Sequence, residues 1–194
     1  MNILVIDNYD SFTYNLVQYV KDVSDYTVAV KRNDEITLDE VEAFDKILIS
    51  PGPGVPEDAG ITKSLIARYG KTKSILGVCL GMQAIAEVYG GKIENLTEVY
   101  HGVASTMNIS HSDSIFHDVP TETEVGRYHS WAVSNNSIPR ELEVLAHTSD
   151  NCIMAIRHKE YDVKGVQFHP ESVLTPYGKQ MIKNWVFALP SSKG

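Results

Sequence analysis

The sequence predicts an α/β fold in three layers: a mainly parallel open sheet with helices on both faces and a small antiparallel extension. Three observations support this. Through the first half of the chain, short apolar runs alternate with stretches whose apolar residues recur at helical spacing. From residue 92 that periodicity gives way to short β-rich pieces, and an amphipathic stretch follows near the end. At about 100–200 residues per domain, the 194 residues predict a single domain, 1–194.

The elements of the first half follow in regular order. A short apolar run that ends in an acid, Asn2–Asp7, predicts a strand, and Ser11–Ser24 predicts the helix after it. Thr27–Val30 is strand-like, the capping-box pattern at Thr37–Glu40 predicts a short helix, and Lys46–Ser50 predicts a buried strand. Such alternation of strands and helices is typical of a parallel sheet.

The later elements continue this pattern and then depart from it. The expected elements are a helix at Ile61–Tyr69, a strand at Ser74–Val78, a helix at Leu80–Tyr89, extension strands at Leu142–Ala146, Cys152–Arg157 and Val163–Phe168, and a last helix at Pro176–Leu189. Ligands of open α/β sheets bind beyond the carboxyl ends of the strands. We therefore expect the functional site at that edge.

The composition disfavours several classes of function. Seventeen Lys and Arg against 25 Asp and Glu give a formal net charge of −8, which disfavours nucleic acid and anionic membranes as partners. No apolar run approaches the roughly 20 residues of a membrane span, and the N-terminus lacks a signal-peptide pattern, so we expect a cytoplasmic protein. Cys79 and Cys152 are too few for a disulfide framework, and no Cys or His spacing predicts a metal site.

A candidate nucleophile stands in the segment Gly77–Gly81 (GVCLG), which ends an apolar strand and opens a helix. This is the nucleophile-elbow pattern with Cys in place of Ser. The glycines relieve the crowding of a sharp turn, and the helix N-terminus favours the thiolate of Cys79. The N–H of Leu80 would be free to face an oxyanion. A buried structural cysteine is the alternative.

A candidate base follows a later strand. His169 lies in GVQFHPES, with Glu171 two residues further on. A cysteine nucleophile needs a base, and the base needs a group that fixes its tautomer, so these two residues would supply both. A solvated loop histidine beside a surface acid is the alternative.

A third candidate segment is the loop Ser50–Glu57 (SPGPGVPE), at the end of a buried strand. Its small residues would let a ligand approach the backbone, so that its N–H groups can act as a second oxyanion donor. The loop lacks the Gly-Lys-Ser/Thr ending of a phosphate loop. An ordinary Pro/Gly loop is the alternative.

Together these segments resemble the triad-type class I glutamine amidotransferases. Cys79 in GVCLGMQ matches the family's nucleophile, and His169 and Glu171 in QFHPES match its base and orienting acid. The order and spacing agree over nearly the whole chain. The resemblance implies a Cys79–His169–Glu171 triad that hydrolyses glutamine through a cysteine thioester.

Three segments look like one branch of that family, the small subunits of anthranilate synthase and of its close relative in para-aminobenzoate (aminodeoxychorismate) synthesis. They are NYDSFTYN at 8–15, SPGPGVPEDAG at 50–60 and RYHSWAV at 127–133. The resemblance implies an oxyanion hole of Gly54 and Leu80. It implies glutamine contacts from Gly52, Pro53, Gly54, Leu80, Gln83, Ser130 and Trp131. Many relatives have Leu where this chain has Trp131, a change without consequence if only the main chain touches glutamine, and one that alters the pocket if the side chain does.

The resemblance also implies a partner, because it leaves no residues for an ammonia acceptor site. We expect ammonia to pass to a chorismate-binding synthase subunit (component I) near the Cys79 pocket. Anthranilate synthesis, which leads to tryptophan, is the first expectation, and aminodeoxychorismate synthesis for folate, or both, is the alternative. No cofactor is expected on this chain, and magnesium, if needed, would lie on the synthase subunit.

Functions of other classes remain as alternatives. A partner-independent γ-glutamyl hydrolase or a cysteine peptidase would use the same Cys–His chemistry. A flavodoxin-like binding module would share the fold but needs a Ser/Thr-rich phosphate turn after the first strand, for which NYDSFTYN is a poor substitute. A non-catalytic regulatory subunit is disfavoured by the intact triad pattern.

Several polar residues have structural explanations of their own. Cys152 lies in an apolar strand and should be core. His101 and Gly102 predict either a structural turn or a place at the edge of the pocket or in an interface. Asp10, Ser11 and Tyr14 either cap the first helix or face a partner. These open choices depend on where the folded chain places each segment.

Overall fold

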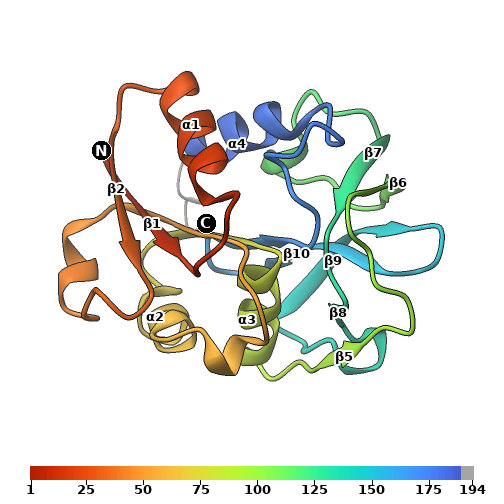
Figure 1. Ribbon diagram of the computed structural model, residues 1–194, viewed down its shortest axis with the longest axis horizontal. Helices are drawn as coiled ribbons and strands as arrows, with labels where there is room; N and C mark the ends of the chain where they lie inside the picture. The colour runs from red at the N-terminus through yellow and green to blue at the C-terminus, as the bar shows by residue number, and fades with distance from the viewer. Residues whose placement is uncertain (189–194) are drawn as a thin grey trace.

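A mixed sheet forms the middle of the computed structural model, which describes residues 1–188 (Figure 1). Within those residues the sheet has nine strands in the order β2-β1-β3-β4-β11-β10-β9-β6-β7. The parallel part consists of β2 (Thr27–Arg32), β1 (Asn2–Asp7), β3 (Lys46–Ile49), β4 (Ser74–Val78) and β11 (Val163–Val166). The antiparallel part consists of β10 (Ile153–His158), β9 (Leu142–Thr148), β6 (Val103–Ile109) and β7 (Glu122–Arg127). A separate pair joins β5 (Ile93–Asn95) to β8 (Trp131–Val133).

Helices cover both faces of the sheet. In Figure 1, α1 (Thr13–Val23) and α4 (Gly178–Phe187) lie above the sheet, and α2 (Thr62–Tyr69) and α3 (Leu80–Val88) lie below it. Each pair packs its apolar residues onto one side of the central strands, which gives two hydrophobic cores. Every residue of β3 and β4 is buried, as a strand covered on both faces requires. The predicted three-layer arrangement is therefore confirmed.

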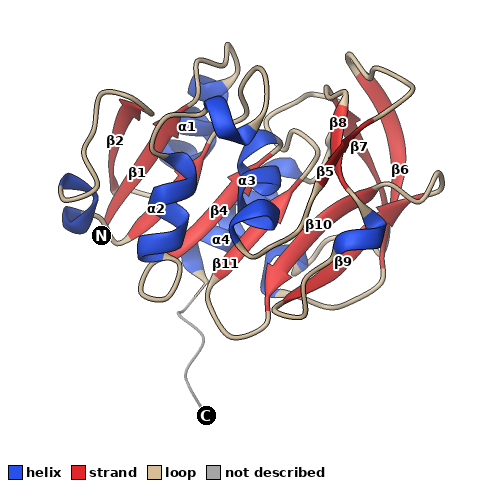
Figure 2. Ribbon diagram, turned by 90° about the horizontal axis from the view of Figure 1, so that it is seen from below, coloured by secondary structure: helices blue, strands red, loops and turns tan. Residues whose placement is uncertain are grey.

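The extension differs from its prediction in one respect. Val163–Phe168 was expected among the antiparallel pieces, but β11 runs parallel to β4 and antiparallel to β10. It is the strand at which the two parts of the sheet meet (Figure 2). The error arises because the direction of a strand depends on the route of the chain before it, which its own residues do not encode.

Element boundaries shift by a few residues at both ends of the chain. The final helix begins at Gly178 rather than at Pro176, and its expected last residue, Leu189, lies outside the described residues. The capping-box pattern does form, since Thr37 N–H and Oγ1–H both donate to Glu40 Oε2, at 2.8 and 2.7 Å. The helix that follows is one short 3₁₀ turn, Glu40–Ala43.

The carboxyl ends of four parallel strands meet at one edge of the sheet. There, β1 leads into residues 8–12, β3 into the Pro/Gly loop, β4 into Cys79 and β11 into residues 167–171. All three segments that carry the predicted chemistry thus share this edge. Across residues 1–188, each helix falls short of the length and apolar character needed to cross a membrane.

Candidate active site

Cys79 sits on a strained turn between β4 and α3. Its φ of 53° and ψ of −103° lie in a region that a side chain rarely adopts, and its side chain is almost buried at 6% exposure. A Cβ on Gly77 would come within 2.4 Å of the backbone of Gly81, so only glycine permits the strand and helix to pack this closely. The turn has the geometry expected of a nucleophile elbow.

His169 and Glu171 form a buried pair after β11. His169 Nδ1 lies 2.7 Å from Glu171 Oε1, and both side chains are enclosed. Burial opposes a charge on the ring, but the facing Cys79 and the Glu171 carboxylate outweigh it and raise the pKa of His169 to about 10. The structure therefore brings the three predicted triad residues together, with the imidazole protonated over the neutral pH range.

The second ring nitrogen of His169, Nε2, is not held by another group within residues 1–188. Among the described residues, His169 Nε2 has no hydrogen-bond partner of standard geometry, although Cys79 is close enough to shift the ring's pKa. Catalytic hydrogen bonds are often long before substrate binds. The free Nε2 is thus the atom available for proton transfer.

The Pro/Gly loop packs directly against the elbow. A Cβ on Gly52 would lie 2.8 Å from Leu80 Cδ2 and 2.6 Å from Asn8 Cβ, so a larger residue could not fit. Gly54 has a φ of 73° and, like Pro53, is open to solvent. The main chain of the loop is therefore accessible beside the first residue of α3, where the second oxyanion donor was expected.

A buried polar network that the sequence analysis did not identify fixes this loop. Asn8 N–H and Nδ2–H donate to Ser50 Oγ and Ser50 O at 2.9 and 2.8 Å. Asn8 Oδ1 in turn accepts from Asn33 Nδ2 at 3.0 Å and from Thr62 Oγ1 at 3.1 Å. Asn8 is the first residue of NYDSFTYN, so the motif was recognised while its function in holding the loop was not.

The remaining glutamine-contact candidates lie on α3, on β8 and directly before β8. Gln83 is almost buried, and its Nε2–H donates to the carbonyl of Trp131 at 2.9 Å and to Gln167 Oε1 at 3.1 Å. Trp131 is therefore tied to the site through its main chain. Ser130 is half-buried beside it, and its carbonyl accepts from Leu96 N–H at 2.7 Å.

Aromatic rings cover the histidine, a feature that sequence reasoning also missed. The ring centroid of Tyr128 lies 4.8 Å from that of His169, and that of Phe12 lies 6.0 Å from it. His101 packs edge-on against Tyr128, with centroids 6.2 Å apart, and Gly102 has a φ of 76°. The pair lies in a bend, and the His101 ring packs against the tyrosine that covers His169.

The structure also places the other polar residues for which the sequence offered a structural explanation. Asp10 Oδ2 accepts from Phe12 N–H at 2.7 Å and so orders the start of α1. Ser11 and Tyr14 are exposed. Cys152 belongs to the hydrophobic core, and burial raises the pKa of its thiol to about 11.

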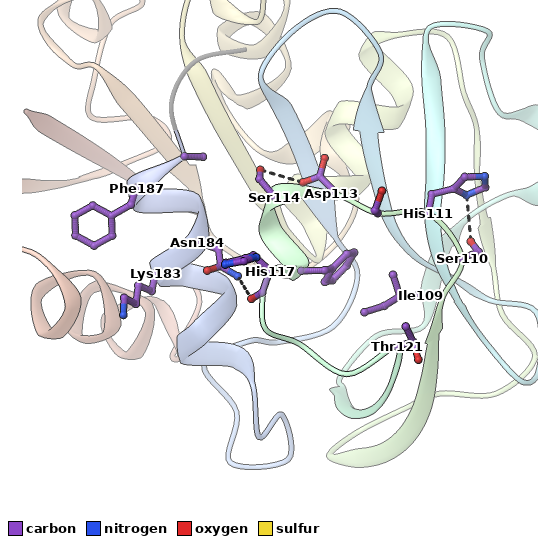
Figure 3. A pocket seen from close by; sticks show the side chains of 13 residues that line it. Ile109, Ser110, His111, Asp113, Ser114, His117, Thr121, Lys183, Asn184 and Phe187 are labelled. Carbon is purple, nitrogen blue, oxygen red and sulfur yellow. Dashed lines mark hydrogen bonds between the residues drawn. The ribbon is translucent and has the colours of Figure 1, made fainter. Parts of the chain in front are cut away.

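One cavity is lined by none of these residues. Figure 3 shows a pocket of about 720 Å³ between the 3₁₀ turn Ser114–Phe116 and α4. Its lining includes His111, His117 and Lys183 and none of the predicted site residues. Within residues 1–188, no three Cys, His, Asp or Glu side chains converge so as to hold a metal ion.

Comparisons with known proteins agree with this geometry. The family model described as glutamine amidotransferase class-I matches residues 4–189. The chain is 47% identical to "Anthranilate synthase component 2" of Cyanophora paradoxa, over 96% of this chain and 99% of that protein. It is 46% identical to "Aminodeoxychorismate/anthranilate synthase component 2" of Bacillus subtilis (95% of each) and 45% identical to "Aminodeoxychorismate synthase component 2" of Escherichia coli (95% of this chain, 98% of that protein).

Solved structures show the same fold. A protein from Thermoplasma acidophilum, described as a GMP synthase subunit, superposes with a TM-score of 0.85 at 24% identity, over 96% of this chain and 92% of that one. A glutamine amidotransferase from Thermotoga maritima gives 0.79 at 12% identity, over 96% of each chain. With a family model that spans nearly its whole length and relatives close to half identical to it, the chain belongs to the class I glutamine amidotransferases.

Proposed function

We propose that this chain hydrolyses glutamine at a Cys79–His169–Glu171 triad. The Cys79 thiolate attacks the carbonyl carbon of the side-chain amide, and protonated His169 gives its proton to the departing nitrogen as the C–N bond breaks. Ammonia leaves and a glutamyl thioester remains. The now neutral His169 takes a proton from water, which attacks the thioester and releases glutamate and the thiolate.

Glu171 holds the imidazole in the orientation that this sequence of proton transfers needs. Its 2.7 Å hydrogen bond to Nδ1 leaves Nε2 directed at the reacting atoms. The negative charge of the tetrahedral intermediate falls to the N–H groups of Leu80 and Gly54. Leu80 is the first residue of α3, where N–H groups have no partner within the helix.

The glutamine substrate is assigned to the space between the loop and α3. Pro53 and Gly54 are exposed and Gly52 is half-buried against Leu80. The hydrogen bond from Gln83 to the carbonyl of Trp131 joins α3 to the segment that carries Ser130. Because Trp131 is engaged through its carbonyl, its side chain can differ from leucine without removing that contact. No cofactor enters this chemistry, and magnesium, if used, is assigned to the synthase subunit.

The ammonia acceptor is assigned to a separate chorismate-binding subunit, component I, as the component names of the relatives suggest. Large apolar side chains stand exposed around the site, among them Tyr14 and Val173, the latter 94% exposed and two residues beyond Glu171. We assign these side chains to the surface that component I would cover. We favour anthranilate synthesis, with aminodeoxychorismate synthesis, or service to both enzymes, as the alternative that the relatives equally suggest.

The observation that carries this proposal is the buried Glu171–His169 pair facing a cysteine on a strained, glycine-flanked turn. Its test is ammonia release from glutamine by the wild-type chain and by Cys79→Ser, each alone and with each chorismate-binding subunit. Release that needs Cys79 and rises with one subunit supports the proposal and identifies the pathway. Release that persists in Cys79→Ser rejects it.

A partner-independent γ-glutamyl hydrolase is the competing activity. It would cleave longer γ-glutamyl peptides without any second subunit, whereas the proposed enzyme should favour free glutamine. The same assay with a γ-glutamyl dipeptide separates the two.

A further inference from the structure

Gln167 makes a contact with the nucleophile that the triad does not explain. It lies directly after β11, two residues before His169, and is fully buried. Its Nε2–H donates to Cys79 Sγ across 3.4 Å. A buried amide that points at a sulfur is a costly arrangement unless the sulfur accepts the hydrogen bond.

The direction of this hydrogen bond follows from the neighbouring groups. The carbonyl of Trp131 can only accept, so the Gln83 atom 2.9 Å from it must be the amide nitrogen. That same nitrogen lies 3.1 Å from Gln167, which must therefore present its oxygen there. The NH₂ group of Gln167 is left facing Cys79, so the sulfur is the acceptor.

The hydrogen bonds on the other side of the Trp131 carbonyl have equally fixed directions. His129 Nδ1–H donates to the Trp131 carbonyl at 2.8 Å, and Arg127 Nε–H donates to His129 Nε2 at 3.2 Å. Burial lowers the pKa of His129 to about 4, against the effect of its backbone hydrogen bond, so the ring is neutral with its single proton on Nδ1. Arg127 is anchored by Asp150 Oδ2 at 3.0 Å. In this series of hydrogen bonds from Arg127 to Gln167, no side chain can exchange its donor and acceptor atoms without losing a buried hydrogen bond.

We propose that Gln167 is a further catalytic residue of the glutaminase reaction, whose side-chain N–H stabilises the negative charge on Cys79 Sγ before attack and again when the thioester breaks. Gln83, Trp131 and His129 act as positioning residues through it. This inference rests on the proposed function. The ionisable group that faces the sulfur is His169, with Glu171 behind it, so Gln167 adds a neutral donor to that pair.

The test is the rate of Cys79 alkylation by iodoacetamide as a function of pH, in wild type, Gln167→Met and Gln167→Glu. Met keeps most of the volume and removes the donor. Glu keeps the shape and the oxygen that faces Gln83, but places an oxygen against the sulfur. Gln180→Met on α4 is the matched control, because within residues 1–188 the Gln180 side chain bonds only Asn184. Thermal unfolding by circular dichroism confirms that each variant is folded.

Loss of a hydrogen bond to a charged group should move the midpoint of the profile upward by about one pH unit or more in Gln167→Met. Gln167→Glu should move it at least as far, and Gln180→Met should leave it unchanged. If Gln167 served packing alone, Gln167→Met, which keeps most of the volume and adds no charge, would match wild type, and that result would overturn the proposal. With component I present, kcat should fall in both Gln167 variants while KM changes little.

A measurement on the unmodified protein covers the case in which the variants do not fold. The side-chain amide protons of Gln167, followed by nitrogen-15 NMR, should titrate with the same midpoint as the alkylation of Cys79. Resonances that do not move overturn the proposal. Because neither alkylation nor NMR requires glutamine or a partner, they test Gln167 even if the chain releases no ammonia.

Discussion

The two cysteines of this chain share one hydrophobic core but differ in every neighbour that decides reactivity. Cys79 and Cys152 are 6% and 8% exposed and belong to the same apolar cluster. Around Cys152, burial raises the pKa of the thiol to about 11, an effect that the nearby Arg127 only partly opposes. Cys79 instead faces a protonated imidazole and an amide donor. Burial suppresses a thiolate, and only placed partners reverse that effect.

The largest expected effect comes from exchanging the sulfur itself. Cys79→Ser should lower glutaminase activity by about 10⁴-fold or more, because a serine beside this histidine is a far weaker nucleophile. Cys152→Ser is the matched control and should retain activity. Ammonia release measured with component I present distinguishes them, and equal losses in the two variants would contradict the contrast between the two thiols.

A smaller loss should follow from neutralising the orienting acid. Glu171→Gln should lower activity by about 10²- to 10³-fold, because the imidazole loses its anionic partner but the nucleophile stays. Below pH 10 the wild-type ring keeps its proton, since the pKa of His169 is raised to about 10 partly by Glu171. The alkaline limb of the pH–rate profile should therefore move to lower pH in the variant. A limb that stays in place would deny Glu171 this role.

The loop scaffold should matter less than the triad. Asn8→Ala keeps the hydrogen bond from its backbone N–H to Ser50 Oγ but removes the one from Nδ2 to the Ser50 carbonyl, so kcat should fall by about 10- to 100-fold as the oxyanion donor loses its position. The free energy of unfolding should fall by about 1–3 kcal/mol. Asn15→Ala, an exposed change on α1, is the control. Steady-state kinetics and urea unfolding of both variants check this, and similar kinetics would remove Asn8 from the catalytic scaffold.

The smallest effect is expected at Cys152, the unreactive thiol of the core. Cys152→Ala should lower the free energy of unfolding by about 1 kcal/mol, the cost of a small core truncation. Its native-state alkylation by iodoacetamide should still label one cysteine, as in wild type. Mass spectrometry of the labelled protein counts the sites, and label on Cys152 in the folded wild-type chain would contradict its assignment to the core.

The sequence predicted the parts of this site whose pattern is local. The elbow at Gly77–Gly81 and the turn that holds His169 and Glu171 are short segments whose geometry follows from their own residues. The strands that bear them are buried along their whole length, and the largely apolar sequence of β4, SILGV, is typical of a strand covered on both faces.

What the sequence could not predict depends on contacts between distant segments. Asn8 meets Ser50, and Gln167 meets Cys79 across 88 positions, so neither role is visible in a local pattern. β6 was missed for another reason: most of its residues are exposed, so it lacks the apolar alternation that marks a half-buried strand. Contacts of this kind become visible only once the sheet has brought the strands together.

The carbonyl of Trp131 has a consequence for how freely this protein can change. Both Gln83 and His129 donate to that oxygen, at 2.9 and 2.8 Å, and every amino acid carries one like it. A point mutation at position 131 therefore cannot delete the acceptor, only displace it. The hydrogen bonds that lead to Cys79 are thus robust to mutation at position 131. A single base change at the codon of Gln83 or Gln167 would break them.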